Sequence, residues 1–170
     1  MWRIRRRLFL GDYASCEEAL GGALYPVEPS EELSPFAGVV SLCPVPLVKG
    51  RGPERPMSEL TEWLKIPIQD GGNGEAEFEA ALGVALPFAW RRLQTGNVLI
   101  HCAAGMSRSV SVVAALLCAE GAAVDDAFRR IARAKASAIG PTVLGEEFLI
   151  APASEFRSCL NRLYRARPHH

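Results

Sequence analysis

The sequence has no excess charge of either sign and no long apolar run, and both absences exclude classes of protein. The 170 residues include 19 Lys and Arg against 19 Asp and Glu, so the overall charge does not indicate a nucleic-acid partner. No apolar stretch reaches the roughly 20 residues that a membrane-spanning helix needs. The apolar segment near the N-terminus is too short for a secretory signal. We therefore expect neither a membrane span nor a nucleic-acid site.

Paired cysteines are also missing. The five cysteines stand at scattered positions, without a CxxC pair or a zinc-ligand spacing. They are Cys16, Cys43, Cys102, Cys118 and Cys159. We expect reduced thiols and a cytoplasmic or nuclear location, because disulfides are rare in reducing compartments. The sequence predicts no metal and no cofactor, and the terminal His169 and His170 are not assigned as metal ligands.

Short apolar runs alternate with helical periodicity along the chain, which is typical of an α/β protein. The expected strands are 8–11, 38–43, 63–68 and 97–101. The expected helices are 75–93, 108–120, 124–135 and 154–164. Pro87 predicts a kink or an early break in the first of these helices, and residues 139–152 receive no assignment. Together the elements predict one domain over residues 1–170, with a central, mostly parallel sheet flanked by helices.

The segment HCAAGMSRS, residues 101–109, joins an expected buried strand to an expected helix. In open α/β sheets, ligands bind at the carboxyl ends of the strands. The unpaired N–H groups of such a loop can converge on an anion, and Arg108 can bind two of its oxygens. We therefore predict a phosphate site in this loop. Its predicted members are Ala103, Ala104, Gly105, Met106, Ser107 and Arg108.

Cys102 lies at the floor of this predicted site. The loop amides, the helix N-terminus and Arg108 all favour the thiolate, so we expect its pKa to lie well below that of a free cysteine. A thiolate beneath a bound phosphate predicts a phosphoryl-cysteine intermediate. We expect His101 to hold the loop by hydrogen bonding, and Ser109 to donate to the sulfur as it leaves in the second step.

A general acid must protonate the leaving oxygen, and Asp70 is the candidate. It follows an expected strand, precedes Gly71 and Gly72, and lies 32 residues before Cys102. The alternative for Asp70 is a turn or capping residue, since aspartate is common before glycine. Weaker candidates for the acid are Asp12, Asp125 and Asp126.

These residues resemble the cysteine-dependent protein tyrosine phosphatases, whose pattern is His-Cys, five residues, Arg, then Ser or Thr. Within that superfamily the chain is most similar to the small dual-specificity phosphatases, in its LFLG strand, Asp70 and the AAG-x-SRS loop. The resemblance covers residues 8–135 and implies hydrolysis of phosphotyrosine and phosphoserine/threonine in proteins. The implied partner is a phosphorylated protein, and no oligomeric state is indicated.

The chain departs from that family after the helix expected to end near Lys135. It has KASAIGPTVLGEEFLIAP there, where the family often has an Arg-Pro element and an asparagine. Lipid-directed relatives often carry lysines inside the loop, whereas Ala103, Ala104 and Met106 stand here. This argues against polyphosphorylated inositol lipids. The alternatives to a protein phosphatase are a phosphatase for another phosphoester, such as a lipid or sugar phosphate, a non-catalytic phospho-binding module, and a sulfur transferase.

Two further features carry hypotheses. In some members of the superfamily, a cysteine at the position of Cys43 forms a reversible disulfide with the nucleophile, here Cys102; the alternative is an ordinary core cysteine. Arginines also alternate partly with apolar residues near the N-terminus, at positions 3, 5, 6 and 7. They predict a solvated edge strand, or else a docking surface for an acidic partner or an anionic surface.

Overall fold

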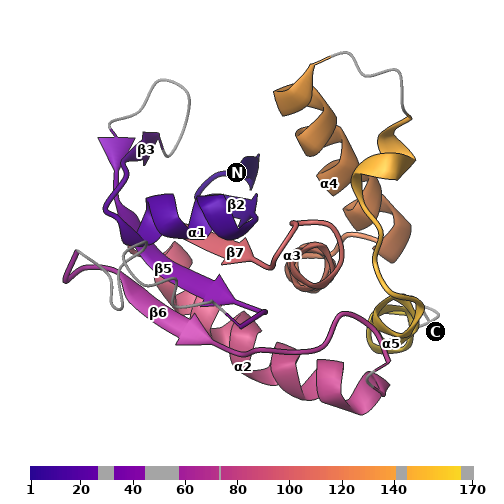
Figure 1. The fold of residues 1–170 in the computed structure, drawn as a ribbon. Helices are drawn as coiled ribbons and strands as arrows, with labels where there is room; N and C mark the ends of the chain where they lie inside the picture. Colours follow the sequence, from indigo (N-terminus) through magenta and orange to yellow (C-terminus); the bar gives the residue numbers. More distant parts are fainter. Residues whose placement is uncertain (27–32, 45–57, 73, 141–144, 166–170) are drawn as a thin grey trace.

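A five-stranded sheet forms the centre of the protein in the computed structural model (Figure 1). The structure describes residues 1–26, 33–44, 58–72, 74–140 and 145–165. In spatial order the strands are β1 (Trp2–Arg5), β2 (Leu8–Gly11), β7 (Asn97–His101), β5 (Phe36–Ser41) and β6 (Glu62–Lys65). β1 pairs antiparallel with β2 and the other pairs are parallel, which confirms the predicted α/β class and mostly parallel sheet.

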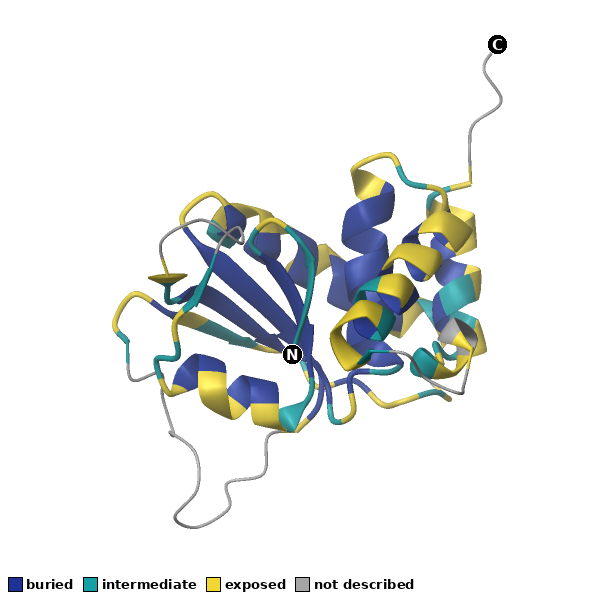
Figure 2. Cartoon of the chain, turned by 90° about the horizontal axis from the view of Figure 1, so that it is seen from above, coloured by how far each residue is buried: buried dark blue, intermediate teal, exposed yellow. Residues whose placement is uncertain are grey.

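Helices cover both faces of this sheet. Figure 1 shows α1 (Tyr13–Leu20) on one face and α2 (Glu75–Leu93) on the other. The remaining elements are α3 (Arg108–Ala119), α4 (Val124–Ile139), the 3₁₀ turn η1 (Glu146–Leu149), α5 (Ser154–Leu163), and the short pair β3 (Tyr25–Pro26) and β4 (Leu33–Ser34). The three inner strands β2, β7 and β5 are buried, whereas most helices present one exposed side (Figure 2).

The central strand β7 shows why the sheet needs helices on both faces. All five of its residues are buried. Val98 and Ile100 join the larger apolar cluster, which includes α2 and α3, whereas Leu99 joins the smaller cluster with residues of α1. Successive side chains of a strand point to opposite faces. A continuous apolar run such as Val98–Ile100 is therefore stable only when both faces are covered.

Near two prolines the structure confirms one predicted element and corrects another: α2 spans Glu75–Leu93 as predicted, whereas the end of β6 differs. Helix α2 continues through Pro87 without a break, because the residues around it, Ala85, Leu86, Phe88 and Ala89, are buried and offset the lost hydrogen bond. Strand β6 ends at Lys65 rather than residue 68. Beyond it, the N–H groups of Ile66 and Ile68 still bind β5-side carbonyls at 2.9 and 3.2 Å, but Pro67 between them has no N–H.

Other differences follow from tertiary contacts. Helix α4 extends four residues beyond the predicted end, to Ile139, and β5 covers 36–41 in place of 38–43. Helix α1 follows the first predicted strand, in a stretch that contains none of the four expected helices. His169 and His170 lie outside the described residues. No helix in the described ranges is long and apolar enough to cross a membrane.

Candidate active site

The loop 102–107 leaves the carboxyl end of β7, the middle strand of the sheet, and enters α3 at Arg108. Its turn depends on Gly105, which has a φ of +67°. A Cβ atom on Gly105 would lie 2.7 Å from Cζ3 of Trp2 and 3.0 Å from the carbonyl oxygen of Gly11. Only glycine tolerates both the backbone conformation and this close approach. Strands β1 and β2 therefore press directly on the back of the loop.

Three outward-facing carbonyls fix the orientation of the loop's peptide groups. The N–H of Tyr13 donates to Ala103 O at 3.3 Å, and the N–H of Ala151 donates to Met106 O at 2.8 Å. The ammonium of Lys135 donates to Gly105 O at 2.8 Å. In a trans peptide the C=O and the following N–H point in opposite directions. The N–H groups of residues 104, 106 and 107 therefore point away from these supports, toward the centre of the loop.

The sulfur of Cys102 lies at the floor of this ring. Cys102 is 1% exposed, and its Sγ lies 3.1 Å from Oγ of Ser109. Burial alone would raise the pKa of the thiol. Hydrogen bonds from the Ser109 hydroxyl and from the amides of Ser109 and Gly105, together with the charge of Arg108, outweigh burial and lower the pKa below the ordinary cysteine value. The geometry therefore favours a thiolate.

Arg108 stands beside this sulfur and is itself 8% exposed. Its Nη1 donates to the carbonyl of Ile68 at 3.1 Å, which holds the guanidinium in place. Its Nε is buried and finds no hydrogen-bond partner in the part of the chain that the structure describes. A buried donor without a partner is costly. An oxygen of a tetrahedral anion in the ring would satisfy it.

Asp70 lies at the mouth of the loop, with its side chain half exposed. Its Oδ2 is 3.5 Å from Nη2 of Arg108. Two residues further on, the N–H of Gly72 donates to Oε1 of Glu155 at 2.5 Å, so the start of α5 holds this segment. The structure thus brings Asp70 to the predicted phosphate site.

The three weaker acid candidates are engaged elsewhere. Asp12 caps α1 and accepts from the N–H of Ser15 at 3.0 Å. Asp125 pairs with Arg157 at 2.8 Å, and Asp126 pairs with Arg129. The Asp125–Arg157 pair joins the exposed start of α4 to α5, and the Asp126–Arg129 pair lies within α4. Among the described residues, none of the three forms a hydrogen bond or an ion pair with Cys102 or Arg108.

His101 is buried and hydrogen-bonded on both ring nitrogens. Nε2 lies 2.5 Å from Oγ of Ser41, which also accepts from Nε1 of Trp63 at 2.8 Å. Nδ1 lies 3.3 Å from Cys102 O. Burial lowers the pKa of His101 to about 4. The network is satisfied by a neutral ring that donates from Nδ1 to the Cys102 carbonyl and accepts from Ser41, an arrangement that orients the loop.

Cys43 is buried near the same end of the sheet, two residues after β5. Burial raises the pKa of its thiol, while the charges of Arg108 and Cys102 also act on it. Both cysteines are free thiols in the structure. The structure therefore buries both thiols at the same end of the sheet, and the role of Cys43 as a redox partner stays a hypothesis.

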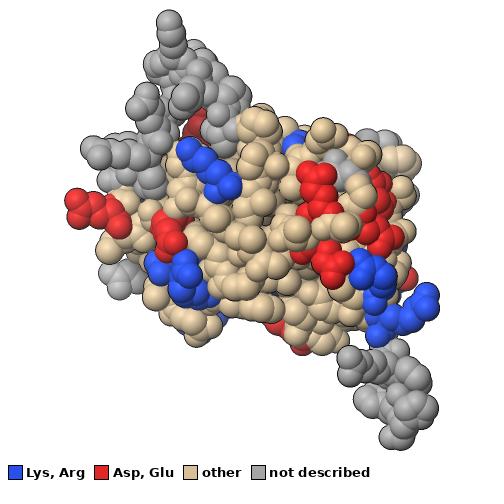
Figure 3. All heavy atoms as spheres, turned by 90° about the horizontal axis from the view of Figure 1, so that it is seen from below, with Lys and Arg blue, Asp and Glu red and all other residues tan. Residues whose placement is uncertain are grey.

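Arg3 and Arg5 belong to the edge strand β1, as one of the two interpretations predicted, whereas Arg6 and Arg7 lie in the turn that follows it. Arg5 pairs with Glu120 at the end of α3. Arg7 donates to the carbonyls of Leu93 and Gln94, at 3.1 and 3.0 Å, at the end of α2. These two side chains thus bind helix ends within the protein. On the face shown in Figure 3, acidic and basic side chains lie among large uncharged areas.

Sequence reasoning missed Lys135, Ser41 and the segment 151–153, although all three support the loop. Ala151 binds Met106, and the N–H of Ala153 donates to Oγ of Ser107 at 3.3 Å. One signal was available: Lys135 follows Ile131 by four residues and so falls on the apolar face of α4. A lysine at such a position is buried here, at 3% exposure.

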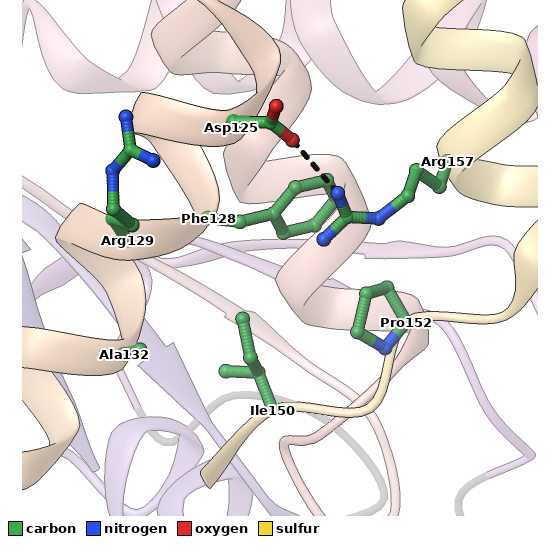
Figure 4. Close-up of a pocket in the computed structure, with 7 residues that line it drawn as sticks. All are labelled: Asp125, Phe128, Arg129, Ala132, Ile150, Pro152 and Arg157. Atoms are coloured by element: carbon green, nitrogen blue, oxygen red, sulfur yellow. Dashed lines mark hydrogen bonds and ion pairs between the residues drawn. The ribbon is translucent and has the colours of Figure 1, made fainter. Parts of the chain in front are cut away.

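A separate cavity of about 440 Å³ lies between α4 and the segment leading to α5 (Figure 4). Phe128, Ile150 and Pro152 form its apolar part, and the guanidinium of Arg157 lies 4.5 Å from the centre of the Phe128 ring. It contains neither Cys102 nor Arg108. Among the described residues, no group of three or more His, Cys, Asp or Glu side chains could hold a metal ion.

Comparisons with known proteins agree with this geometry. The family model of the dual specificity phosphatase catalytic domain matches residues 52–149, more than half of the chain. The chain therefore belongs to the dual specificity phosphatase family, as its resemblance predicted. A comparison with curated protein sequences gave no match.

Solved structures of low sequence identity share the fold. Human DUSP28 superposes with a TM-score of 0.61 at 20% identity, over 97% of this chain and 96% of that one. DUSP15 gives 0.64 at 20% identity, over 96% and 86%. PTPMT1, solved in complex with PI(5)P, gives 0.61 at 17% identity, over 96% and 93%. These matches confirm the architecture, and the family assignment supports phosphatase activity.

Proposed function

We propose that this phosphatase hydrolyses phosphotyrosine and phosphoserine/threonine monoesters of proteins through a cysteinyl-phosphate intermediate. The observation that carries the proposal is the position of the Cys102 sulfur, bound by Ser109 and two amides, beside an arginine whose buried Nε is unpaired. Such a site complements a tetrahedral dianion and a sulfur nucleophile at once.

In the first step the thiolate of Cys102 attacks phosphorus in line with the ester oxygen. The S–P bond forms as the P–O bond breaks, and Asp70 gives its proton to the leaving oxygen. Arg108 and the inward amides bind the three equatorial oxygens, whose charge is spread over the transition state. The products are the dephosphorylated hydroxyl and a cysteinyl phosphate.

In the second step water attacks phosphorus from the side that the leaving group vacated. The carboxylate of Asp70 accepts the water's proton, and the S–P bond breaks to release inorganic phosphate. The electron pair returns to Sγ, where the Ser109 hydroxyl, 3.1 Å away, stabilises the thiolate by donating a hydrogen bond. His101 stays neutral throughout and holds the loop by its two hydrogen bonds.

The loop composition supports a protein substrate over a polyphosphorylated lipid. Ala103, Ala104 and Met106 add no cation to the loop, so these positions offer no positive charge to bind a second phosphate group. The best-supported alternative is a phosphatase for a singly phosphorylated lipid or sugar, because the fold is shared with PTPMT1, solved with PI(5)P. We place the protein in a reducing compartment, the cytoplasm or nucleus, where a low-pKa thiolate stays reduced.

A substrate panel tests the proposal. Phosphotyrosine, phosphoserine and phosphothreonine peptides are compared with phosphoinositides and sugar phosphates, with p-nitrophenyl phosphate as the general substrate. We expect kcat/KM to be highest on the peptides, and turnover to disappear in Cys102→Ser. A higher kcat/KM on a lipid or sugar phosphate would overturn the proposal of a protein substrate in favour of that phosphoester. Peptide binding without turnover by the unaltered protein would favour a phospho-binding module.

A further inference from the structure

Lys135 is a buried cation behind the catalytic loop. It lies on α4, far from the loop in sequence, and is 3% exposed. Its Nζ donates to Gly105 O at 2.8 Å and stands 4.2 Å from the centre of the Trp2 ring. In the described part of the chain no carboxylate forms an ion pair with it. Burying an ammonium without a counter-ion is costly, so the position of Lys135 needs a functional reason.

The contact with Gly105 fixes one peptide group of the loop. Because the Gly105–Met106 peptide is planar and trans, an oxygen held toward Lys135 directs the Met106 N–H toward the loop centre. The other two supports of the loop, from Tyr13 and Ala151, come from backbone N–H groups. Lys135 is the side-chain support in this set, and it is also charged. A cation on the oxygen polarises the peptide and strengthens its N–H as a donor.

The Trp2 ring packs beside the Lys135 ammonium against the same glycine. Its Cζ3 atom would lie 2.7 Å from a Cβ on Gly105, so the ring packs directly on this glycine. The ring face also attracts the ammonium. A residue of β1 and a residue of α4 therefore both contact Gly105 and contact each other.

The charge of Lys135 also acts on the nucleophile. Burial lowers the pKa of Lys135, while the negative charges of Cys102 and Asp12 raise it, so lysine and thiolate favour each other's charged forms. The other charged group that faces the sulfur is Arg108, which pairs with Asp70. Lys135 thus adds a second positive charge, on the opposite side of the loop from the substrate.

We infer that Lys135 is a positioning residue of the proposed reaction, which directs the Met106 N–H at the phosphate and favours the thiolate of Cys102 from behind the loop. The inference rests on the proposed function, because it takes Cys102 as the nucleophile. It adds a residue that contacts neither the sulfur nor the substrate.

The test measures the thiolate directly. The rate of iodoacetamide alkylation at Cys102, followed by mass spectrometry across pH, gives the thiol pKa without any substrate. Lys135→Met removes the charge and the donor, and we expect the pKa of Cys102 to rise by about one unit. We expect kcat/KM on p-nitrophenyl phosphate to fall about 10-fold. Lys135→Gln keeps a donor without the charge and should retain the pKa rise with a smaller loss of rate. In Lys135→Arg, the pKa of Cys102 and kcat/KM should both lie close to the values of the unaltered protein.

Lys65 offers a matched control, since its Nζ stands 3.7 Å from the Trp63 ring centre on the exposed edge strand. Lys65→Met should leave the alkylation profile unchanged. An unchanged profile in Lys135→Gln, or a lower melting temperature as its only effect, would overturn the inference. If Lys135→Met does not fold, Lys135→Gln decides. Absence of turnover in the unaltered protein, with the alkylation shift present, would instead count against the proposed function alone.

Discussion

Nη2 of Arg108 lies 3.5 Å from Oδ2 of Asp70, so the arginine at the phosphate site also contacts the candidate general acid. The same guanidinium donates through Nη1 to the carbonyl of Ile68, two residues before Asp70. One side chain therefore sets the spacing between the phosphate site and the acid. The remaining nitrogen, the buried Nε, stays unpaired among the described residues.

From this relationship we predict that Asp70→Asn loses the acid but keeps the phosphate site. kcat on a poor leaving group such as an alkyl phosphate should fall about 100- to 1,000-fold. The alkaline limb of the kcat profile should flatten, because no carboxyl is left to lose its proton. The loss should be much smaller for p-nitrophenyl phosphate, whose leaving group needs little protonation. Steady-state kinetics across pH on both substrates measures this.

The matched control is Asp126→Asn, which removes a carboxylate paired with Arg129 at the start of α4. It should leave both profiles unchanged. An alkaline limb that persists in Asp70→Asn would assign the acid to another group.

Ser109→Ala should slow the second chemical step more than the first. Its hydroxyl is buried and 3.1 Å from the sulfur, where it stabilises the departing thiolate. We expect a burst of p-nitrophenol followed by a steady rate about 10- to 100-fold lower, with the cysteinyl phosphate trapped by acid quench. The pKa of Cys102 should rise as well, since the serine hydroxyl helps to lower it. A linear progress curve without trapped intermediate would contradict this role.

Most of the site that could be predicted from sequence is encoded within a few residues; Asp70, 32 residues before Cys102, is the exception and was placed by its position after an expected strand. His101, Cys102, Arg108 and Ser109 stand at fixed offsets, and their side chains meet because one strand, one loop and one helix join them. The apolar run of β7 likewise predicted a strand buried on both faces. The physical reason is local: covalent connection limits where these groups can lie.

The supports of the loop could not be predicted, because they come from distant elements. Trp2, Ser41, Lys135 and Ala151 reach the loop only after the sheet order and the packing of α4 are known. Their spacing along the chain carries no signal of this meeting. The early break that Pro87 allows does not occur, because its intrinsic cost is offset by the burial of its neighbours in α2.

The proposed redox pair of Cys43 and Cys102 predicts a specific oxidation product. A thiolate at Cys102 reacts with peroxide to a sulfenic acid, and the Cys43 thiol displaces water to form a disulfide. We expect a Cys43–Cys102 linked peptide after mild peroxide, and activity that returns with dithiothreitol. Cys43→Ser should instead give irreversible sulfinic acid at Cys102. Cys118→Ser, at a buried cysteine of α3, is the control and should behave as the unaltered protein. If oxidation of Cys102 stays reversible in Cys43→Ser, the proposed Cys43–Cys102 disulfide is wrong.

The buried His101 predicts how stability depends on acid. Its folded pKa is lowered to about 4 by burial, against an ordinary value of 6.5. Between these values the unfolded chain binds the extra proton, so stability is present above pH 6.5 and is lost as pH falls toward 4. The loss should approach about 3 kcal/mol. Urea unfolding from pH 7.5 to 4.5 measures this loss. His101→Asn should have a lower free energy of unfolding at pH 7.5, and that free energy should change less between pH 7.5 and 4.5.

The other two histidines, His169 and His170, provide the control, because their joint replacement by Ala should leave the pH dependence of the free energy of unfolding unchanged. An unaltered slope in His101→Asn would mean that other groups set the acid sensitivity.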